Sequence, residues 1–185
     1  MNRKLLITIH TLLAGFFFIT AMLFLITGGL MSLGVDGDHE ESNHILQLKQ
    51  KLPSDIHQLK AIVAAEMLAK GLSLPKGKLD LEMDGDQLGL EWEGAHHSVI
   101  LESSNNPLQA TLTIESAGNF RYLTNLHKSE GGNASKVLAV TWALGLLTLL
   151  LTGILMAWQS PKYKILSLQA MGAGAVCVLI VAYFS

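Results

Sequence analysis

The sequence predicts an α-helical membrane protein with three transmembrane helices and a small extracytoplasmic α+β domain between helices one and two. Three observations predict this class. Half of the 185 residues are hydrophobic, and the mean hydropathy is positive. Three long stretches contain no Asp, Glu, Lys or Arg. All 15 acidic residues lie together between the first two of these stretches.

Each apolar stretch is long enough to cross a bilayer, which takes roughly 20 residues of α-helix. The stretches cover residues 5–33, 137–158 and 165–184, and the first is interrupted only by His10. The first stretch far exceeds the roughly 7–15 apolar residues of a signal peptide. We therefore expect an uncleaved anchor followed by two further transmembrane helices.

The basic residues predict the orientation of these helices. Two precede the first helix in residues 1–4, and two lie in the short loop 159–164 between the second and third helices. Because Lys and Arg collect on the cytoplasmic side of membranes, both segments are predicted to be cytoplasmic. Residues 34–136 then lie on the other side, where Lys136 is an exception to the charge rule.

The extracytoplasmic stretch is acidic. From Asp36 to Glu130 it holds 15 acidic and 8 basic residues, which gives a formal charge of −7. Residues 34–52 are predicted to form an acidic linker, with a short helix over 44–51. Residues 53–130 are predicted to form the α+β domain, which at this size has a small core.

The domain is predicted to begin with a helix and to continue with about four antiparallel strands. Ser54 or Asp55 caps the helix, which shows apolar residues at helical spacing until about Lys70. Apolar and polar residues then alternate with period two, as in a strand with one face in water. The predicted strands lie at residues 79–84, 88–92, 99–102 and 108–114, with a hairpin signal at Asp84-Gly85.

Two of the apolar stretches end in nearly the same string. LITGGLM covers residues 25–31, and LLTGILM covers residues 150–156. When the two strings are aligned, Thr27-Gly28 falls on Thr152-Gly153. The second helix is therefore predicted to resemble the first.

These motifs resemble the PepSY-associated transmembrane (PepSY-TM) family. Members typically have a basic N-terminus, a helix with a His and a terminal Thr-Gly, a PepSY-type domain, and a Leu-His pair before a helix ending in Thr-Gly-x-x-x-x-Trp. The matching residues are His10, Thr27-Gly28, Leu126-His127, Thr152-Gly153 and Trp158. The resemblance covers nearly the whole chain. It implies a small three-helix member in a bacterial inner membrane, with a PepSY-like domain in the periplasm.

Larger members of this family are linked to siderophore-iron reduction, and some are thought to use haem. The resemblance therefore makes His10 and His127 candidate ligands of haem b. Among Asp, Glu, Lys, Arg and His, His10 is the only residue within a predicted span, which makes it a functional candidate. The two histidines are predicted to lie about 30 Å apart across the membrane, so each needs an axial partner from a second copy or another subunit. A structural hydrogen bond is the alternative role for both.

Other polar groups give weaker candidates. Asp36, Asp38, His39 and His44 offer oxygen and imidazole ligands for a divalent metal, although a solvated acidic linker also explains them. Adjacent strand residues point to opposite faces, so the pair His96-His97 is predicted to be exposed at a turn rather than to share a ligand.

Catalytic residues are not evident. Glu91 and Glu93 flank Trp92 and are predicted to share the wet face of a strand, where alternating acids are ordinary. The sequence contains no Ser/His/Asp, P-loop, GxGxxG or zinc-protease motif. An enzyme is therefore the less favoured class.

Three functional hypotheses follow. The favoured one is a non-catalytic binding or accessory subunit that lies in the lipid bilayer and contacts a protein partner or a second copy of itself. Small residues such as Gly145, Ala170 and Gly174 are predicted to let its helices pack closely. The second is a haem-bearing electron-transfer or siderophore-iron-reductase component. The third is a regulator of periplasmic proteolysis, and no nucleic-acid partner is expected for any of them.

Overall fold

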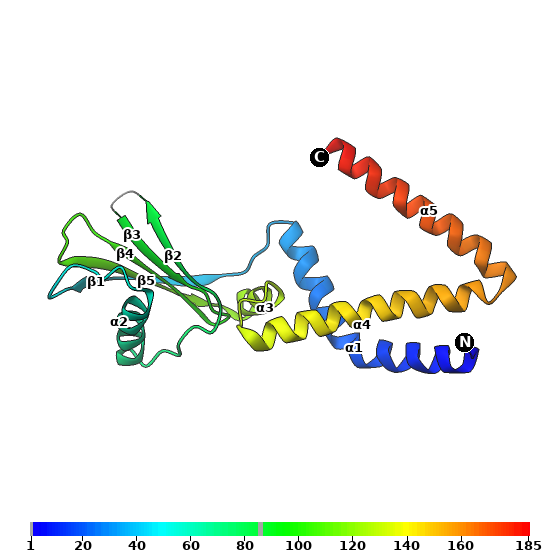
Figure 1. Ribbon diagram of the computed structural model, residues 1–185, viewed down its shortest axis with the longest axis horizontal. Helices are drawn as coiled ribbons and strands as arrows, with labels where there is room; N and C mark the ends of the chain where they lie inside the picture. Colours follow the sequence, from blue (N-terminus) through cyan, green and yellow to red (C-terminus); the bar gives the residue numbers. More distant parts are fainter. Residues whose placement is uncertain (1, 85–86) are drawn as a thin grey trace. The chain divides into compact units, whose positions relative to one another are not determined.

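The computed structural model describes residues 2–84 and 87–185 (Figure 1). The predicted hairpin signal at Asp84-Gly85 therefore lies partly outside the described residues. In chain order the elements are α1 (Arg3–Ser32), β1 (His39–Gln47), α2 (Ile56–Ala69), β2 (Leu79–Asp84), β3 (Gln87–Trp92), β4 (His97–Ser103), β5 (Gln109–Ala117), α3 (Asn119–His127), α4 (Asn133–Trp158) and α5 (Pro161–Phe184).

The helices α1, α4 and α5 are long and apolar enough to span a membrane. Most of their large apolar side chains are exposed, and apolar surface of this extent is stable in lipid rather than in water. The three predicted apolar helices are thus confirmed. The second of them begins at Asn133, four residues earlier than predicted, so that Lys136 belongs to its first turn.

One compact unit is formed by Met1–Ala21 and Thr141–Ser185. Within it, the buried side chain of Phe17 lies over Gly145, where a Cβ atom would overlap the ring. The centroids of the Phe17 and Trp142 rings are 5.6 Å apart. The small residue in α4 therefore allows α1 to approach closely, as predicted.

The third helix does not follow that prediction. No residue of α5 is buried, and a Cβ atom on Gly174 would meet nothing within 4 Å. The expectation that Ala170 and Gly174 pack α5 against the other two helices is therefore wrong for the single chain.

The other compact unit, Met22–Val140, contains a five-stranded antiparallel sheet with the strand order β1-β5-β4-β3-β2. Helix α2 covers one face of this sheet (Figure 1). Asp55 caps α2 by accepting a 2.9 Å hydrogen bond from the backbone N–H of Gln58. The helix buries Leu59, Val63 and Met67 against the sheet.

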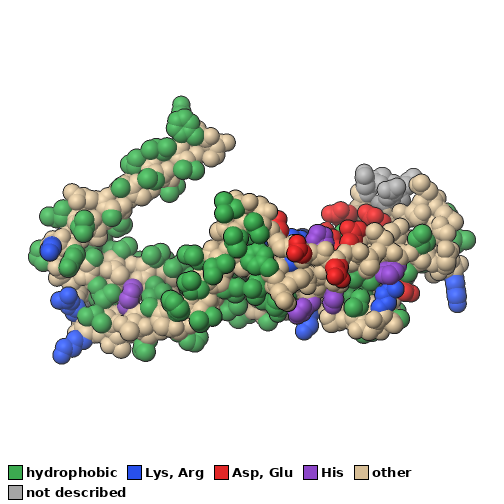
Figure 2. All heavy atoms as spheres, turned by 180° about the vertical axis from the view of Figure 1, so that it is seen from behind, with side chains coloured by type: hydrophobic (Ala, Val, Ile, Leu, Met, Phe, Trp, Pro, Cys, Tyr) green, Lys and Arg blue, Asp and Glu red, His purple; other side chains and the backbone are tan. Residues whose placement is uncertain are grey.

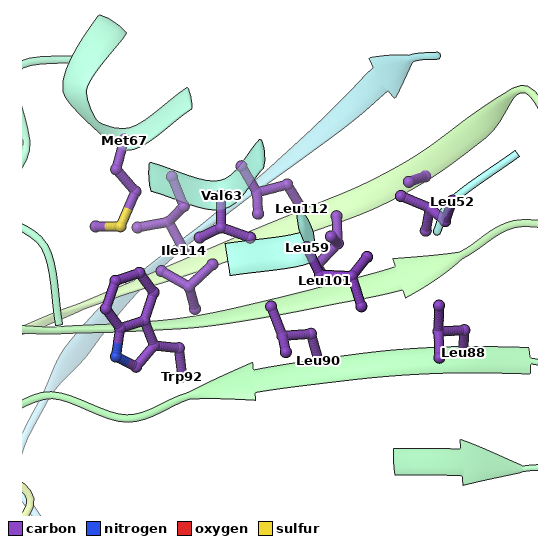
Figure 3. Packing of buried hydrophobic residues seen from close by; sticks show 12 residues of the cluster. Leu52, Leu59, Val63, Met67, Leu88, Leu90, Trp92, Leu101, Leu112 and Ile114 are labelled. Atoms are coloured by element: carbon purple, nitrogen blue, oxygen red, sulfur yellow. The ribbon is translucent and has the colours of Figure 1, made fainter. Parts of the chain in front are cut away.

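The core of the sheet unit is formed by alternate residues of the strands and by this face of α2 (Figure 3). Strands β3, β4 and β5 contribute Leu88, Leu90, Trp92, Val99, Leu101, Ala110, Leu112 and Ile114. Each large aliphatic side chain buried in this way contributes about 1.5–3 kcal/mol. The predicted period-two alternation in these strands is confirmed, and it leaves the opposite face of the sheet open.

The predicted fold class must nevertheless be corrected. The sequence predicts a helix-first domain with about four strands between the first two membrane helices. Instead the sheet has five strands, its first strand precedes α2, and its compact unit includes the end of α1 and the start of α4. The apolar helices and the sheet are therefore not divided at the boundaries that the sequence predicted.

The main error concerns residues 34–52, predicted to be an acidic linker with a short helix over 44–51. Nine of these residues form β1, which pairs with β5 from His39 opposite Ala117 to Gln47 opposite Gln109. The strand lies at the edge of the sheet, and none of its residues is fully buried. It therefore lacks the apolar alternation that identified the other strands.

Close backbone contacts fix the sheet to the adjacent helices. The backbone N–H of Gly118 donates to the carbonyl of Asp38 over 2.9 Å, just before α3. Gly132 precedes α4 with a φ of 82°, and its Cα lies against the backbone carbonyl of Lys76. The buried Asn125 of α3 donates through its Nδ2 to the carbonyl of Ala95, 3.2 Å away. These contacts join the start of β1, the loop before β2 and the loop before β4 to α3 and α4.

Candidate functional site

His127, the last residue of α3, contacts the repeated Thr-Gly motif of α1. Its Nδ1 lies 2.7 Å from the Oγ1 of Thr27, and its ring stacks on Phe24 with 4.6 Å between the ring centroids. A Cβ atom on Gly28 would lie 3.0 Å from the Cε1 of His127. The hydroxyl of Thr27 thus makes a hydrogen bond with the imidazole ring, and Gly28, which has no side chain, leaves room for the Cε1 edge of that ring. We call these four residues the His127 site.

His10 makes the equivalent contact with the second copy of the motif. Its Nδ1 lies 2.9 Å from the Oγ1 of Thr152 on α4. A Cβ atom on Gly153 would lie 3.8 Å from the Cε1 of His10. We call these three residues the His10 site. Each site lies within one of the two compact units.

The hydrogen bonds around each threonine determine where the imidazole proton lies. Thr27 Oγ1 is 2.6 Å from the carbonyl oxygen of Leu23, and Thr152 Oγ1 is 2.8 Å from that of Thr148. A carbonyl oxygen only accepts, so each hydroxyl donates its single proton to the backbone. Each hydroxyl therefore accepts from the Nδ1–H of its histidine.

This arrangement fixes the tautomer of a neutral ring. When Nδ1 carries the proton, Nε2 keeps its lone pair and can accept a hydrogen bond or bind a metal. Histidines that bind metals usually donate their other ring N–H to a fixed acceptor. The two sites can therefore act either as hydrogen bonds that join helices or as oriented ligands.

Sequence reasoning found the members of both sites but not their pairing. It aligned Thr27-Gly28 with Thr152-Gly153 and singled out His10 and His127, yet treated them as separate features. The available signal was the antiparallel course of the first two helices. It brings the start of α1 to the end of α4, where His10 meets Thr152, and it brings the end of α1 to the segment just before α4, where His127 of α3 meets Thr27.

The proposed metal ligands before and within β1 are spread out. His39 lies opposite Ala117 and His44 lies opposite Leu112, so the two histidines are on opposite faces of the strand. Asp36 and Asp38 use their backbone carbonyls to accept from Thr124 Oγ1 and Gly118 N. Within residues 2–84 and 87–185, no three His, Cys, Asp or Glu side chains are placed to hold a metal ion.

The pair His96-His97 has specific contacts. His96 stacks on Tyr122 with 4.0 Å between the ring centroids. His97 begins β4, and its Nδ1 lies 3.2 Å from Ser116 Oγ. Burial, and secondly the neighbouring His96, lower the pKa of His97. The prediction that both are exposed turn residues is therefore wrong for His97, which is half-buried on a strand.

The open face of the sheet carries most of the carboxylates on the strands. Figure 2 shows acidic side chains gathered over this part of the molecule. We call it the acidic face, and the strand register places on it Glu41, Asp80, Glu82, Glu91, Glu102 and Glu115. Among the described side chains, Asp80 alone of these six forms an ion pair, with Lys78. Burial, and then the nearby Glu93, Glu82, Asp80 and Glu115, raise the pKa of Glu91.

A Glu91→Gln substitution tests this crowding of carboxylates. A raised pKa in the folded state favours folding below the unfolded value of about 4.5, and this contribution is lost as pH rises through the folded pKa. We expect Glu91→Gln to raise the thermal unfolding temperature at pH 7.5 by only about 1–2 °C, because partly exposed charges are well screened. At pH 4 we expect no such effect, because the carboxyl group is then largely protonated in both states. Scanning fluorimetry at both pH values measures this, and Glu40→Gln is the control on the other face. Equal effects at the two pH values would contradict the assignment.

A Thr27→Val substitution tests the His127 site. Valine keeps the shape of threonine but leaves the Nδ1–H of His127 without its acceptor, which costs about 1–3 kcal/mol. Thr148→Val is the control, because Thr148 makes the same type of backbone hydrogen bond without a histidine. In a double-mutant cycle with His127→Leu, we expect Thr27→Val to add little further loss. Additive losses would show that the two side chains are not coupled.

The chain matches no protein-family model, no curated protein sequence and no solved structure.

Proposed function

We propose that this chain is a non-catalytic binding subunit of a bacterial inner membrane, related to the PepSY-associated transmembrane family. Its N-terminus is cytoplasmic and residues 34–136 are periplasmic. The acidic face of the sheet binds a basic surface of a partner protein.

The observation that carries this proposal is the acidic face on a sheet fixed to apolar helices. Two of its carboxylates, Glu82 and Glu102, lie on either side of Gly89 across three neighbouring strands. Both are exposed, and neither forms an ion pair among the described side chains. Potentials of opposite sign at such surfaces guide association and select partners.

The orientation is supported by the charges at the helix ends. Four basic residues lie in residues 1–4 and 159–164, and all 15 acidic residues lie between Asp36 and Glu130. The positive-inside rule places the first group in the cytoplasm. Cysteine labelling of an introduced residue near Glu40 in intact cells, with and without outer-membrane permeabilisation, tests the periplasmic assignment.

Purification of the tagged full-length protein after mild crosslinking tests the partner. We expect a membrane or periplasmic protein with a basic surface to be recovered at low salt and lost at high salt, because exposed charges are screened. The double variant Glu82→Gln/Glu102→Gln should lose it. Glu40→Gln/Glu66→Gln removes the same charge elsewhere and should keep it. If the partner is recovered equally well with Glu82→Gln/Glu102→Gln, the proposal is contradicted.

The second candidate function is electron transfer through haem b. It is favoured by the fixed Nδ1–H of His10 and His127, which leaves Nε2 available as an axial ligand. The two histidines have different partners, so each would hold a separate haem b together with a residue of another chain. When bound, the haem supplies one-electron chemistry, and this chain's residues hold and orient one ligand for each group.

An optical spectrum distinguishes the two candidates. The full-length protein is expressed with haem supply, purified in mild detergent, oxidised and then reduced with dithionite. Sharp reduced bands at near-stoichiometric amounts, lost in His10→Ala or His127→Ala, support the haem function. A spectrum without haem bands contradicts the haem function and favours the binding subunit.

A further inference from the structure

A hollow of about 420 Å³ lies where the sheet meets the helices within the unit Met22–Val140. We call it the junction pocket. Its walls come from the loop before β2, the loop between β3 and β4, helix α3 and the first turn of α4. It belongs neither to the acidic face nor to the two histidine sites.

The polar residues that line the junction pocket are one lysine and several hydrogen-bonding residues. They are Ser73, Lys76, His96, His97, Tyr122 and Ser135. None of the described residues that line it is Asp or Glu, although the surrounding stretch has a formal charge of −7. A pocket that gathers donors in an acidic domain is chemically suited to an anion.

Several of these groups are held in place before any ligand arrives. The rings of His96 and Tyr122 are stacked at 4.0 Å. The backbone of Lys76 is fixed by its contact with Gly132. The first turn of α4 adds the positive end of a helix dipole to the same wall. Groups that are already ordered lose little freedom when they bind.

The pocket lies next to exposed apolar side chains of α4. Ser135 lines it, and two and five residues further along α4 the side chains of Val137 and Val140 are 66% and 60% exposed. At 1.5 Å per residue, Val137 is about 3 Å along the helix from Ser135. On α3, Leu126 lines the pocket and precedes His127, which contacts Phe24 of α1. With α4 spanning the membrane as proposed above, the pocket would lie at the depth of the lipid headgroups.

We propose that the junction pocket binds the phosphate group of an anionic lipid from the adjacent leaflet. The ammonium of Lys76 and the donors of Tyr122 and Ser73 bind the phosphate oxygens. The acyl chains lie along the exposed apolar surface of α4. A lipid with a polar headgroup and apolar chains also fits a cavity that is lined by both polar and apolar residues.

The test uses the full-length protein in mild detergent and native mass spectrometry of bound lipid. Phosphatidylglycerol, phosphatidylcholine and inorganic phosphate are the probes. We expect one phosphatidylglycerol per chain, bound more tightly than phosphatidylcholine. Lys76→Gln should weaken it about tenfold, the loss expected for one charge-assisted contact. Tyr122→Phe should weaken it less, and Lys49→Gln is the control that removes an exposed lysine outside the pocket.

Lys76 is exposed, so its substitution should leave the fold intact, which thermal unfolding verifies. Equal phosphatidylglycerol affinity in Lys76→Gln and Lys49→Gln would overturn the site. Equal affinity for the two lipids would overturn its selectivity for an anion. If inorganic phosphate binds as tightly as phosphatidylglycerol and depends equally on Lys76, the pocket binds free phosphate, and the proposal of a lipid ligand is overturned.

Discussion

Replacing Gly132 with alanine is expected to separate the sheet from the start of α4. Among the substitutions that add one methyl group, it should lower the free energy of unfolding most. Gly132 has a φ of 82°, which costs an L-residue about 1–2 kcal/mol. The added Cβ would also overlap the backbone carbonyl of Lys76, which cannot rotate away as a side chain would. The two costs together should exceed about 3 kcal/mol, in the range of severe overpacking.

A matched control separates the two costs. Gly71 has a φ of 72°, and a Cβ atom there would meet nothing within 4 Å. Gly71→Ala should therefore lower the free energy of unfolding only by the cost of a positive φ at an alanine. Chemical unfolding of the full-length protein in detergent, followed by tryptophan fluorescence, compares the variants. Equal losses in Gly132→Ala and Gly71→Ala would show that the contact with Lys76 does not stabilise the fold.

The second large effect is expected at Gly145, where α1 and α4 meet in the other unit. A methyl group there would overlap the ring of Phe17, which is 6% exposed and packs on Trp142. The ring must leave its buried position, so we expect Gly145→Ala to destabilise the helix pair by about 1–3 kcal/mol. Without a hydrophobic force between helices in lipid, close packing is the main attraction that is lost.

The comparison for this variant is Gly172→Ala in α5, which also adds one methyl group to an apolar helix. A Cβ atom on Gly172 would meet nothing within 4 Å. Because alanine favours helices over glycine, Gly172→Ala should be neutral or slightly stabilising in a protease-resistance or thermal assay of the reconstituted protein. Losses of similar size at both positions would contradict the close approach of α1 and α4.

Apolar composition was sufficient to predict the three long helices, because a bilayer requires runs of apolar residues and the sequence has three. Alternation predicted β2 to β5. In β3, β4 and β5 it reflects one face buried against α2, whereas β2 is an edge strand of which only Leu79 packs partly against the core. The edge strand β1 escaped prediction because residues such as Glu40 and Ser42 occupy its inward positions. Pairing with β5, which is remote in sequence, determines its conformation.

The histidine sites show a different limit. Their residues were selected because a histidine in an apolar helix is unusual and because Thr-Gly recurs. The pairing of His10 with Thr152 and of His127 with Thr27 depends on which helix is adjacent. The junction pocket was beyond sequence reasoning altogether, since Lys76, His96 and Tyr122 come from three separate segments.

The chain segments that connect the sheet to the apolar helices are short, and this affects how a partner can bind. Six residues separate α1 from β1, one separates β5 from α3, and five separate α3 from α4. The acidic face is therefore tethered and cannot turn freely, as it would on a long flexible linker. If the proposed partner is anchored in the same bilayer, it would meet this face by diffusion in two dimensions and at a high effective concentration. Weak contacts at this face would then be sufficient for a lasting complex, even where the separated domains would bind poorly in solution.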